Sequence, residues 1–434
     1  MVKRILALWV LVCGIHGTVS AQTTPDVEDF MVDGIHVLLK NNVQNNVVSS
    51  ILFLQGGVIN LRGHNPFLEN YSLTVPAASG PMTTTKELYR AVTSRLFTVI
   101  NADAARDYAD MTCVCVKDYW NTSWTLFTDV LMQPRYDSVE FERIRRQTIL
   151  NINARPSSPD DYDRFLADSM FFSGHLYFMP GTIADVQRLT IDSLSAYHDA
   201  LMVKSRMLLV VVGNVTKEDL VQKIQNTLSK FPEGNYVDLG FRQPVRCASS
   251  GVFLQQATLP TMYITGYAGA PKESDFDYWP TVIAMSMLSS RLFDELRIKR
   301  NLTYAASSEL ISGKLCFGKV YLTTEFPDSC MAIIREQMQV LMNRAPSQTE
   351  INYHINLWIT QVGQRQETNI SQAETMGREQ LVSGWWRNAY LIIDRLRELS
   401  GTDIQRCAQR YFRNFNFAVL GDTTRIRDKA CFVW

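Results

Sequence analysis

Hydrophobic and polar positions follow two different periods along this 434-residue chain. Short apolar runs that predict strands, GIHVLLKNN and VVSSILFLQGG, open the first half, and GVFLQQA and PTMYITGYAG open the second. Later stretches such as SVEFERIRRQTILNINA and DYWPTVIAMSMLSSRLFDELRIKR carry apolar residues every three or four positions, which predicts amphipathic helices. This order predicts α+β domains, each a mostly antiparallel sheet with helices packed on one face.

The same series of elements occurs twice. In the first half a helix that begins at Asp192 leads to an apolar strand and then to Gly213. Near the end of the chain a helix that begins at Asp403 leads to a similar strand and to Gly421. The two aspartates are 211 residues apart and the two glycines 208, so the chain is predicted to be a duplicated domain.

The predicted boundary between the copies is the stretch FPEGNYVDLGFRQPVR, residues 231–246, which shows neither a helical nor an alternating period. We therefore expect an N-terminal domain over residues 22–230, a linker over 231–246 and a C-terminal domain over 247–434.

The first 21 residues have the features of a cleaved export signal. Lys3 and Arg4 precede the apolar run ILALWVLVCGI, and Val19 and Ala21 stand where a signal peptidase reads small residues. The run is too short to span a bilayer, and no later stretch reaches the roughly 20 apolar residues that a span needs. We expect an exported protein without a membrane span, either periplasmic or secreted. A lipid-modified Cys13 is the minor alternative.

Charge and cysteine content narrow the function classes. The 43 basic and 43 acidic residues cancel, so nothing in the overall charge favours nucleic acid or an anionic membrane as a partner. Seven cysteines follow the signal, an odd number without a CxxC pair, which disfavours a disulfide scaffold or a cysteine-rich metal site. Cys113 and Cys115 alternate with valines, as in a strand with thiols on its buried face.

One short segment, NPFLEN, has the outline of a metal site without its ligands. A zinc peptidase of the inverted type needs histidines at i and i+4 of one helix and a glutamate beside the second. Here those positions hold Pro66 and Asn70, and Glu69 stands at the position of the base. Proline offers no lone pair, and an amide is a poorer zinc ligand than imidazole.

The surroundings of this segment resemble the pitrilysin/insulinase family of zinc peptidases, in which a strand that ends in glycine leads to the HxxEH helix. LFLQGGVINLRGHNPFLEN has this layout, and INADAARDYADMTCVCVKDYWNTSWTLFTDVLMQP is similar to the strands and helix that follow in the family. The resemblance aligns Asn151 with the family's third zinc ligand, a glutamate. It implies one half of a clam-shell with a degenerate zinc site at Pro66, Asn70 and Asn151.

Glu69 has two interpretations. It is either the remnant of a catalytic base or a helix-start residue that favours the positive end of the dipole, with Asn65 as the cap and Pro66 at the first position. The second is preferred because a base without a metal-bound water has nothing to activate. A rearranged zinc site is disfavoured, because the six histidines form no i, i+4 pair.

The segment SSRLFDELRIKRNLTYAASSE, residues 289–309, carries the most specific part of the resemblance. Leu288, Leu292 and Leu296 line one helical face, and Asn301 suits the left-handed turn where the family has glycine. In the family an Arg and a Tyr, here Arg297 and Tyr304, bind substrate and steady the oxygen that gains charge. Spacing alone favours a solvated helix-end arginine and a core tyrosine, and the surrounding match is what favours the functional role.

Three functional hypotheses follow. In the first, the chain is the catalytically incomplete subunit of a heterodimeric zinc peptidase: it binds extended peptide and supplies Arg297 and Tyr304 to the zinc of a homologous HxxEH subunit, with no metal of its own. The peptide would add a strand to a sheet edge, which we expect near VINADAARDYAD. In the second, it is a structural or peptide-binding homologue without a role in catalysis. The third, a self-sufficient metallopeptidase, is disfavoured.

Overall fold

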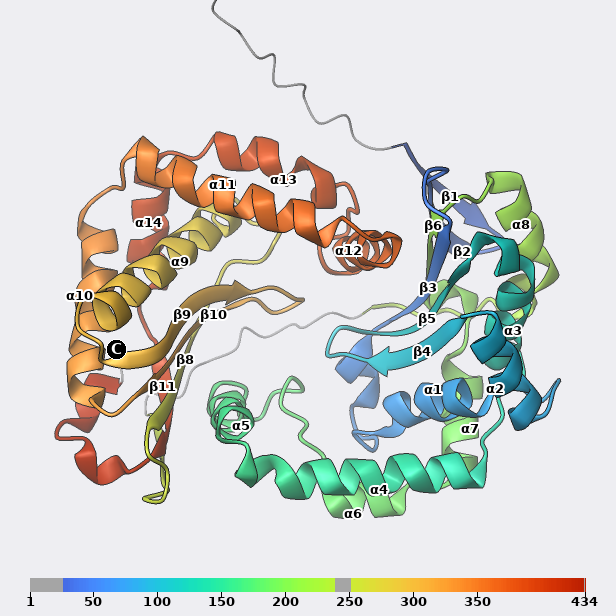
Figure 1. Cartoon of the computed structure of the whole chain (residues 1–434), viewed down its shortest axis with the longest axis horizontal. Helices are drawn as coiled ribbons and strands as arrows, with labels where there is room; N and C mark the ends of the chain where they lie inside the picture. Colours follow the sequence, from blue (N-terminus) through green and yellow to red (C-terminus); the bar gives the residue numbers. More distant parts are fainter. Residues whose placement is uncertain (1–25, 239–250, 433) are drawn as a thin grey trace, which may run out of the picture.

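The computed structural model describes residues 26–238, 251–432 and 434, and the strands in this part of the chain form two sheets (Figure 1). The predicted signal, residues 1–21, and residues 239–246 of the predicted linker lie outside the described residues. The domain boundaries therefore stay predictions. The N-terminal sheet contains β1 (Val27–Val32), β2 (Ile35–Asn41), β3 (Val47–Gln55), β4 (Val99–Ala104), β5 (Tyr108–Val116) and β6 (Met207–Gly213). The C-terminal sheet contains β7 (Val252–Gln255), β8 (Met262–Gly269), β9 (Thr303–Ile311), β10 (Phe317–Thr324) and β11 (Asn416–Gly421).

The two sheets have the same topology. The N-terminal order is β1-β2-β6-β3-β5-β4 and the C-terminal order is β7-β11-β8-β10-β9, so the second sheet repeats the first without β1. In each sheet one pair is parallel, β2 with β6 and β7 with β11, and the other pairs are antiparallel. The predicted α+β class and the predicted duplication are both present in this arrangement.

Helices follow the strands in the same order in both halves. The N-terminal half contains α1 (Leu68–Ser79), α2 (Lys86–Arg95), α3 (Trp120–Met132), α4 (Ser138–Ala154), α5 (Pro159–Phe171), α6 (Ile183–Arg188), α7 (Ile191–Leu201) and α8 (Lys217–Asn226). The C-terminal half contains α9 (Tyr278–Leu292), α10 (Pro327–Asn343), α11 (Gln348–Arg365), α12 (Asn369–Val382), α13 (Asn388–Arg397) and α14 (Gly401–Tyr411). By their place in the series, α1 and α4 correspond to α9 and α11, and α5 corresponds to α12. None of these helices combines the length and the apolar character needed to cross a bilayer.

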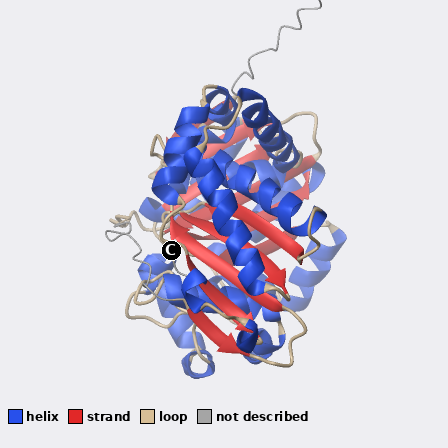
Figure 2. Cartoon of the chain, turned by 90° about the vertical axis from the view of Figure 1, so that its left-hand side faces the viewer, coloured by secondary structure: helices blue, strands red, loops and turns tan. Residues whose placement is uncertain are grey.

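Each sheet packs one face against helices of its own half. Apolar residues of the N-terminal sheet meet α1, α3 and α8, with Cys113 and Cys115 of β5 buried in this layer as expected. The C-terminal sheet packs in the same way against α9, α10 and α14, and Figure 2 shows helices laid over the strands on this side of the molecule. These two layers hold the largest cores, and in each half the helices of that half cover one face of its sheet, as predicted.

The opposite faces are covered by an exchange of helices between the halves. Ala373 and Met376 of α12 pack on Phe53 of β3 and on β6, whereas Phe171 of α5 packs on Tyr267 of β8 and on β11. Polar contacts reinforce both: Asp163 of α5 accepts a hydrogen bond from Thr265 at 2.6 Å, and Asn369 of α12 donates to the Val47 carbonyl at 2.6 Å. Figure 1 shows α5 near the C-terminal sheet and α12 near the N-terminal one. The two halves are thus joined through reciprocal contacts of corresponding helices.

Candidate functional site

The positions that the resemblance aligns with zinc ligands lie at the start of α1 and near the end of α4. The first turn of α1 is preceded by a turn in which the Asn65 side chain accepts a hydrogen bond from the Phe67 N–H at 3.0 Å. The helix therefore begins at Leu68, two residues later than predicted, with Phe67 rather than Asn65 as its first flanking residue. Pro66 belongs to that turn, so the expected placement of Pro66 at the first helical position is wrong.

The two asparagines that the resemblance aligns with zinc ligands are engaged in other bonds. Asn70 donates to a carboxylate oxygen of Asp103 on β4 at 3.3 Å. Asn151 is exposed and accepts a hydrogen bond from Gln147 of the same helix at 2.9 Å. The helices that carry them pack together, because the Tyr71 hydroxyl donates to Thr148 at 2.6 Å. The fold thus brings the aligned positions onto neighbouring helices.

Glu69 does not point into an open site. Its carboxylate forms an ion pair with Arg206, which lies just before β6, and each side chain is 1% exposed. Arg206 also donates to the Gln55 carbonyl at 2.5 Å. Burial raises the pKa of Glu69, and the charge and hydrogen bond of Arg206 oppose that rise. Glu69 lies in the first turn as expected, but its partner is a buried guanidinium and not the helix dipole alone.

Metal ligands do not gather elsewhere in the described part of the chain. Within residues 26–238, 251–432 and 434, no group of three or more His, Cys, Asp or Glu side chains is placed to hold a metal ion. The N-terminal site therefore contains the buried Glu69–Arg206 ion pair, whose two charges cancel, and the amide side chains of Asn70 and Asn151.

Arg297 and Tyr304 lie next to each other where a helix turns into the outer strand of the C-terminal sheet. The Arg297 guanidinium carbon is 5.3 Å from the centroid of the Tyr304 ring, within the range of a cation–π contact. Tyr304 is 82% exposed, which excludes the interpretation as a core tyrosine. The pair presents a positive charge and a phenol hydroxyl at the surface.

The local backbone accounts for this placement. Helix α9 ends in a π-helical turn, Phe293–Ile298, and Asn301 then adopts the left-handed conformation with φ of 51°, as predicted. Arg297 donates to the Asn301 side chain at 2.9 Å and to the Thr303 carbonyl at 3.3 Å. These bonds fix the arginine over the turn. Among the described residues, no hydrogen bond, ion pair or ring contact joins Arg297 or Tyr304 with Glu69, Asn70 or Asn151.

Each sheet has two outer strands with one unpaired edge each in the described structure. These strands are β1 and β4 in the N-terminal sheet and β7 and β9 in the C-terminal sheet. The edge expected near VINADAARDYAD is β4, whose side chains alternate between exposed and covered positions. A strand of this kind has free backbone groups that an extended peptide can pair with.

Comparison with known proteins agrees with this geometry. The chain superposes on the crystal structure of a peptidase M16 inactive domain from Pseudomonas fluorescens with a TM-score of 0.83 and 16% identity, over 92% of this chain and 98% of that one. A family model described as the peptidase M16 inactive domain matches residues 188–357. The chain is a homologue of the M16 peptidases. The predicted resemblance to a zinc peptidase family, without the HxxEH motif, is confirmed.

Curated relatives of this M16 homologue include proteins with and without peptidase names. It is 19% identical over 265 residues to the non-peptidase homolog YmxG of Helicobacter pylori, and 24% identical over 263 residues to the mitochondrial-processing peptidase subunit beta of Blastocladiella emersonii. These matches cover 58% and 56% of the chain. They span 60% and 55% of the two relatives, which is less than two thirds of either.

Sequence reasoning missed Arg206. It lies 137 residues from Glu69, and a basic residue before an apolar strand gave no signal that it would be buried. The only hint was the glutamate itself, since a buried carboxylate needs a cationic partner.

Proposed function

We propose that the M16 homologue is the non-catalytic subunit of a two-chain zinc peptidase. In this proposal it binds extended peptide and supplies Arg297 and Tyr304 to the zinc site of a homologous subunit with an intact HxxEH motif. The observation that carries the proposal is the adjacent, surface-accessible Arg297–Tyr304 pair in a chain whose zinc positions hold Pro66, Asn70 and Asn151.

The chemistry of the pair suits this role. A guanidinium stays charged at every physiological pH, and a phenol donates one directed hydrogen bond, so together they can stabilise a tetrahedral oxyanion on a partner's metal. Arg297 is held by the Asn301 side chain and the Thr303 carbonyl, so little ordering of the guanidinium is needed when substrate arrives. The zinc would belong to the partner subunit, and none is assigned to this chain.

The test is peptide cleavage by a mixture of this chain with an exported HxxEH homologue of similar length. Arg297→Ala and Tyr304→Phe should each lower kcat by about 100-fold, the usual effect of removing one oxyanion donor, while the assembly seen by gel filtration stays unchanged. Arg300→Ala is the matched control, because Arg300 lies in the same turn but pairs with Glu295.

A second candidate function is that of a purely structural or peptide-binding homologue, which the similarity to the non-peptidase homolog YmxG favours. Full activity of the mixture with both variants would support this function and exclude the first. Export is part of the proposal in either case. N-terminal sequencing of the mature protein should then give Gln22 as the first residue.

A further inference from the structure

A cavity of about 740 Å³ lies between the two halves, beside α12 and the face of the N-terminal sheet that α12 covers. Its walls include Asp110 of β5, Trp279 of α9, Trp358 of α11 and Glu374 of α12. Helices α9 and α11 are the counterparts of α1 and α4, which carry Asn70 and Asn151. The volume falls within the range of small-molecule sites, roughly 300–1,000 Å³.

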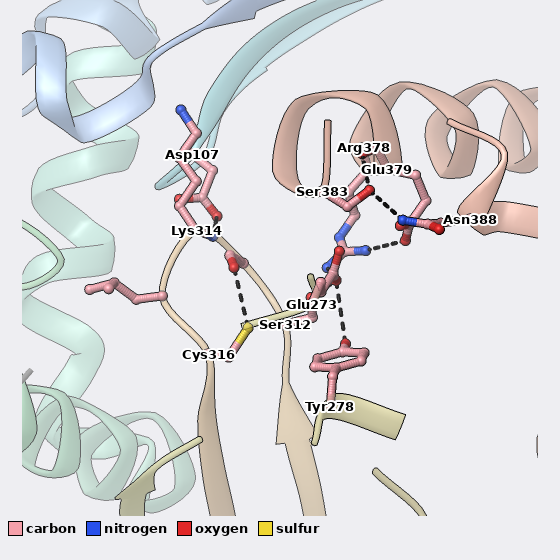
Figure 3. A network of polar contacts seen from close by, with 12 residues as sticks. Asp107, Glu273, Tyr278, Ser312, Lys314, Cys316, Arg378, Glu379, Ser383 and Asn388 are labelled. Carbon is pink, nitrogen blue, oxygen red and sulfur yellow. Dashed lines mark hydrogen bonds and ion pairs between the residues drawn. The ribbon is translucent and has the colours of Figure 1, made fainter. Parts of the chain in front are cut away.

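The charges of this cavity do not balance. Five carboxylates line it, from Asp110, Glu273, Glu309, Glu374 and Glu379, against the two guanidinium groups of Arg365 and Arg378. Arg378 is held by Glu273 and Glu379, each at 3.1 Å (Figure 3), and Glu309 pairs with Lys319 at 3.0 Å. Asp110 and Glu374 have no basic partner among the residues that the structure describes.

A buried carboxylate oxygen in the same cavity also lacks a hydrogen-bond donor in the described structure. Glu273 is 8% exposed, and its Oε1 accepts hydrogen bonds from Arg378, from Tyr278 and from Ser312. Its Oε2 is buried and has no hydrogen-bond partner in the described structure. A buried acceptor of this kind costs free energy unless a donor reaches it.

The apolar part of the wall is aromatic. Trp279 and Trp358 meet edge to face with ring centroids 5.8 Å apart. The guanidinium of Arg365 already lies over the Trp358 ring, 5.7 Å from its centroid. Carboxylates beside indole rings form the type of surface that recognises ammonium and guanidinium groups with an aliphatic stem.

We propose that this cavity binds an organic cation, the guanidinium or ammonium end of a ligand whose aliphatic stem contacts the tryptophans. The cation lies between Asp110 and Glu374, within the negative field of Glu273. The same chemistry is available from a small free amine and from the basic side chain of an extended peptide. Neither Arg297 nor Tyr304 lines this cavity, so the test of cation binding does not depend on the proposed function.

The protonation of the two carboxylates agrees with this assignment. Burial, opposed by the hydrogen bond from Thr112 and aided by the neighbouring Asp103 and Glu374, raises the pKa of Asp110 to about 6. Burial also raises the pKa of Glu374. Two carboxylates that repel each other in a partly desolvated cavity are stabilised by a cation bound between them.

The experiment is calorimetric titration of the full chain with two probes. One is agmatine, a free aliphatic guanidine, and the other is an acetylated peptide of alanine and serine with one central arginine. The same peptide with citrulline is the neutral control. Asp110→Asn and Glu374→Gln should each weaken binding of the cationic probes roughly tenfold or more. Glu367→Gln should not, because Glu367 is exposed just before α12 and does not line the cavity.

The relative affinities of the two probes identify the source of the cation. If agmatine binds as tightly as the arginine peptide, the site is assigned to small amines. If the peptide binds more tightly than agmatine, the site is assigned to a peptide side chain. The proposal is overturned if neither probe binds at millimolar concentration, if citrulline binds equally, or if both carboxylate variants keep wild-type affinity. Both variants remove like-charge repulsion, so an unchanged or higher Tm shows that any lost binding is not lost folding.

Discussion

At the residue scale, the buried Glu69–Arg206 pair sets a test of stability. Glu69→Leu removes one charge and leaves Arg206 buried without its counter-ion, which should cost about 3–5 kcal/mol of unfolding free energy. The double variant Glu69→Leu/Arg206→Met replaces both charges by apolar groups and should recover most of that loss. Denaturant unfolding of the single and double variants measures the difference.

Glu218→Ala serves as the control for this cycle. Glu218 is exposed in the first turn of α8, so its removal should change stability by no more than about 0.5 kcal/mol. If the double variant were as unstable as Glu69→Leu alone, the unpaired buried guanidinium would not be the cause of the stability lost in the single variant.

A second residue, Asp163, should make stability depend on pH. It lies on α5 against the C-terminal sheet, and burial raises its pKa to about 8, while the hydrogen bond from Thr265 lowers it. The unfolded carboxyl has a pKa of about 3.9. Between these values the folded state holds a proton that the unfolded state releases, so stability is greatest at low pH and falls as pH rises, by up to about 1.4 kcal/mol per pH unit.

Asp163→Asn keeps the shape of the protonated group and cannot ionise. Compared with this variant, the wild type should lose unfolding free energy between about pH 5 and pH 7 in urea titrations. The exposed Asp118 offers the control Asp118→Asn, which should follow the wild type. Parallel pH profiles for wild type and Asp163→Asn would show that the buried carboxyl stays ionised.

Residue-level prediction from sequence worked where the determinants are local. Asn301 was expected in the left-handed turn because few residues other than glycine tolerate it, and the structure places it there. Tyr304 and Arg297 also come together through a short helix-turn-strand. Arg206 could not be assigned to Glu69, since pairing across 137 residues depends on sheet order.

At the element scale, the exchanged helix α12 depends on close approach to β3. A Cβ atom at Gly377 would overlap the Phe53 ring, so Gly377→Ala should destabilise by about 1–3 kcal/mol although alanine is the better helix former. Gly363 of α11 has no heavy atom near the corresponding position, and Gly363→Ala should stabilise by about 0.5–1 kcal/mol. Thermal unfolding of both variants measures the opposite signs.

Comparison of the two Gly→Ala variants controls for helix propensity, because both glycines lie inside helices of the same half. If Gly377→Ala also stabilised the protein, the packing of α12 on Phe53 would be looser than its position indicates. Adding Phe53→Leu to Gly377→Ala should reduce the cost by making room for the methyl group.

Elements were predicted well where one period dominates. Helix α4 spans Ser138–Ala154, the bounds of the predicted amphipathic stretch, and β3 and β8 lie within their predicted apolar runs. The start of α1 differed because the Asn65 side chain closes a turn before the helix. The π-helical turn after α9 was not predicted, since its apolar period continues that of the helix.

At the scale of the whole molecule, the reciprocal packing of α5 and α12 predicts that the halves unfold together. Each sheet has one face that is covered only when the other half is folded. Native-state hydrogen exchange should therefore give β3 and β6 the same opening free energy as β8 and β11. Two separate free energies would indicate that the exchanged helices contribute little.

The duplication was predictable from sequence, but the exchange was not. Two copies of an apolar strand and a capped helix recur about 210 residues apart, and matching sheets follow from that repeat. Nothing in the local pattern of α5 or α12 states which sheet they cover, because an amphipathic helix fits either apolar face.

The exchange also has a consequence for recombination between homologues. A chimera joined between residues 238 and 251 would unite the N-terminal half of one parent with the C-terminal half of another, and both exchanged helices would meet a foreign sheet. A chimera that moves α5 together with β8 and β11, and keeps α12 with β3 and β6, would preserve each native contact. The unit that must come from one parent is therefore a sheet together with the helix of the opposite half that packs on it. The residues of this unit are not contiguous in the sequence.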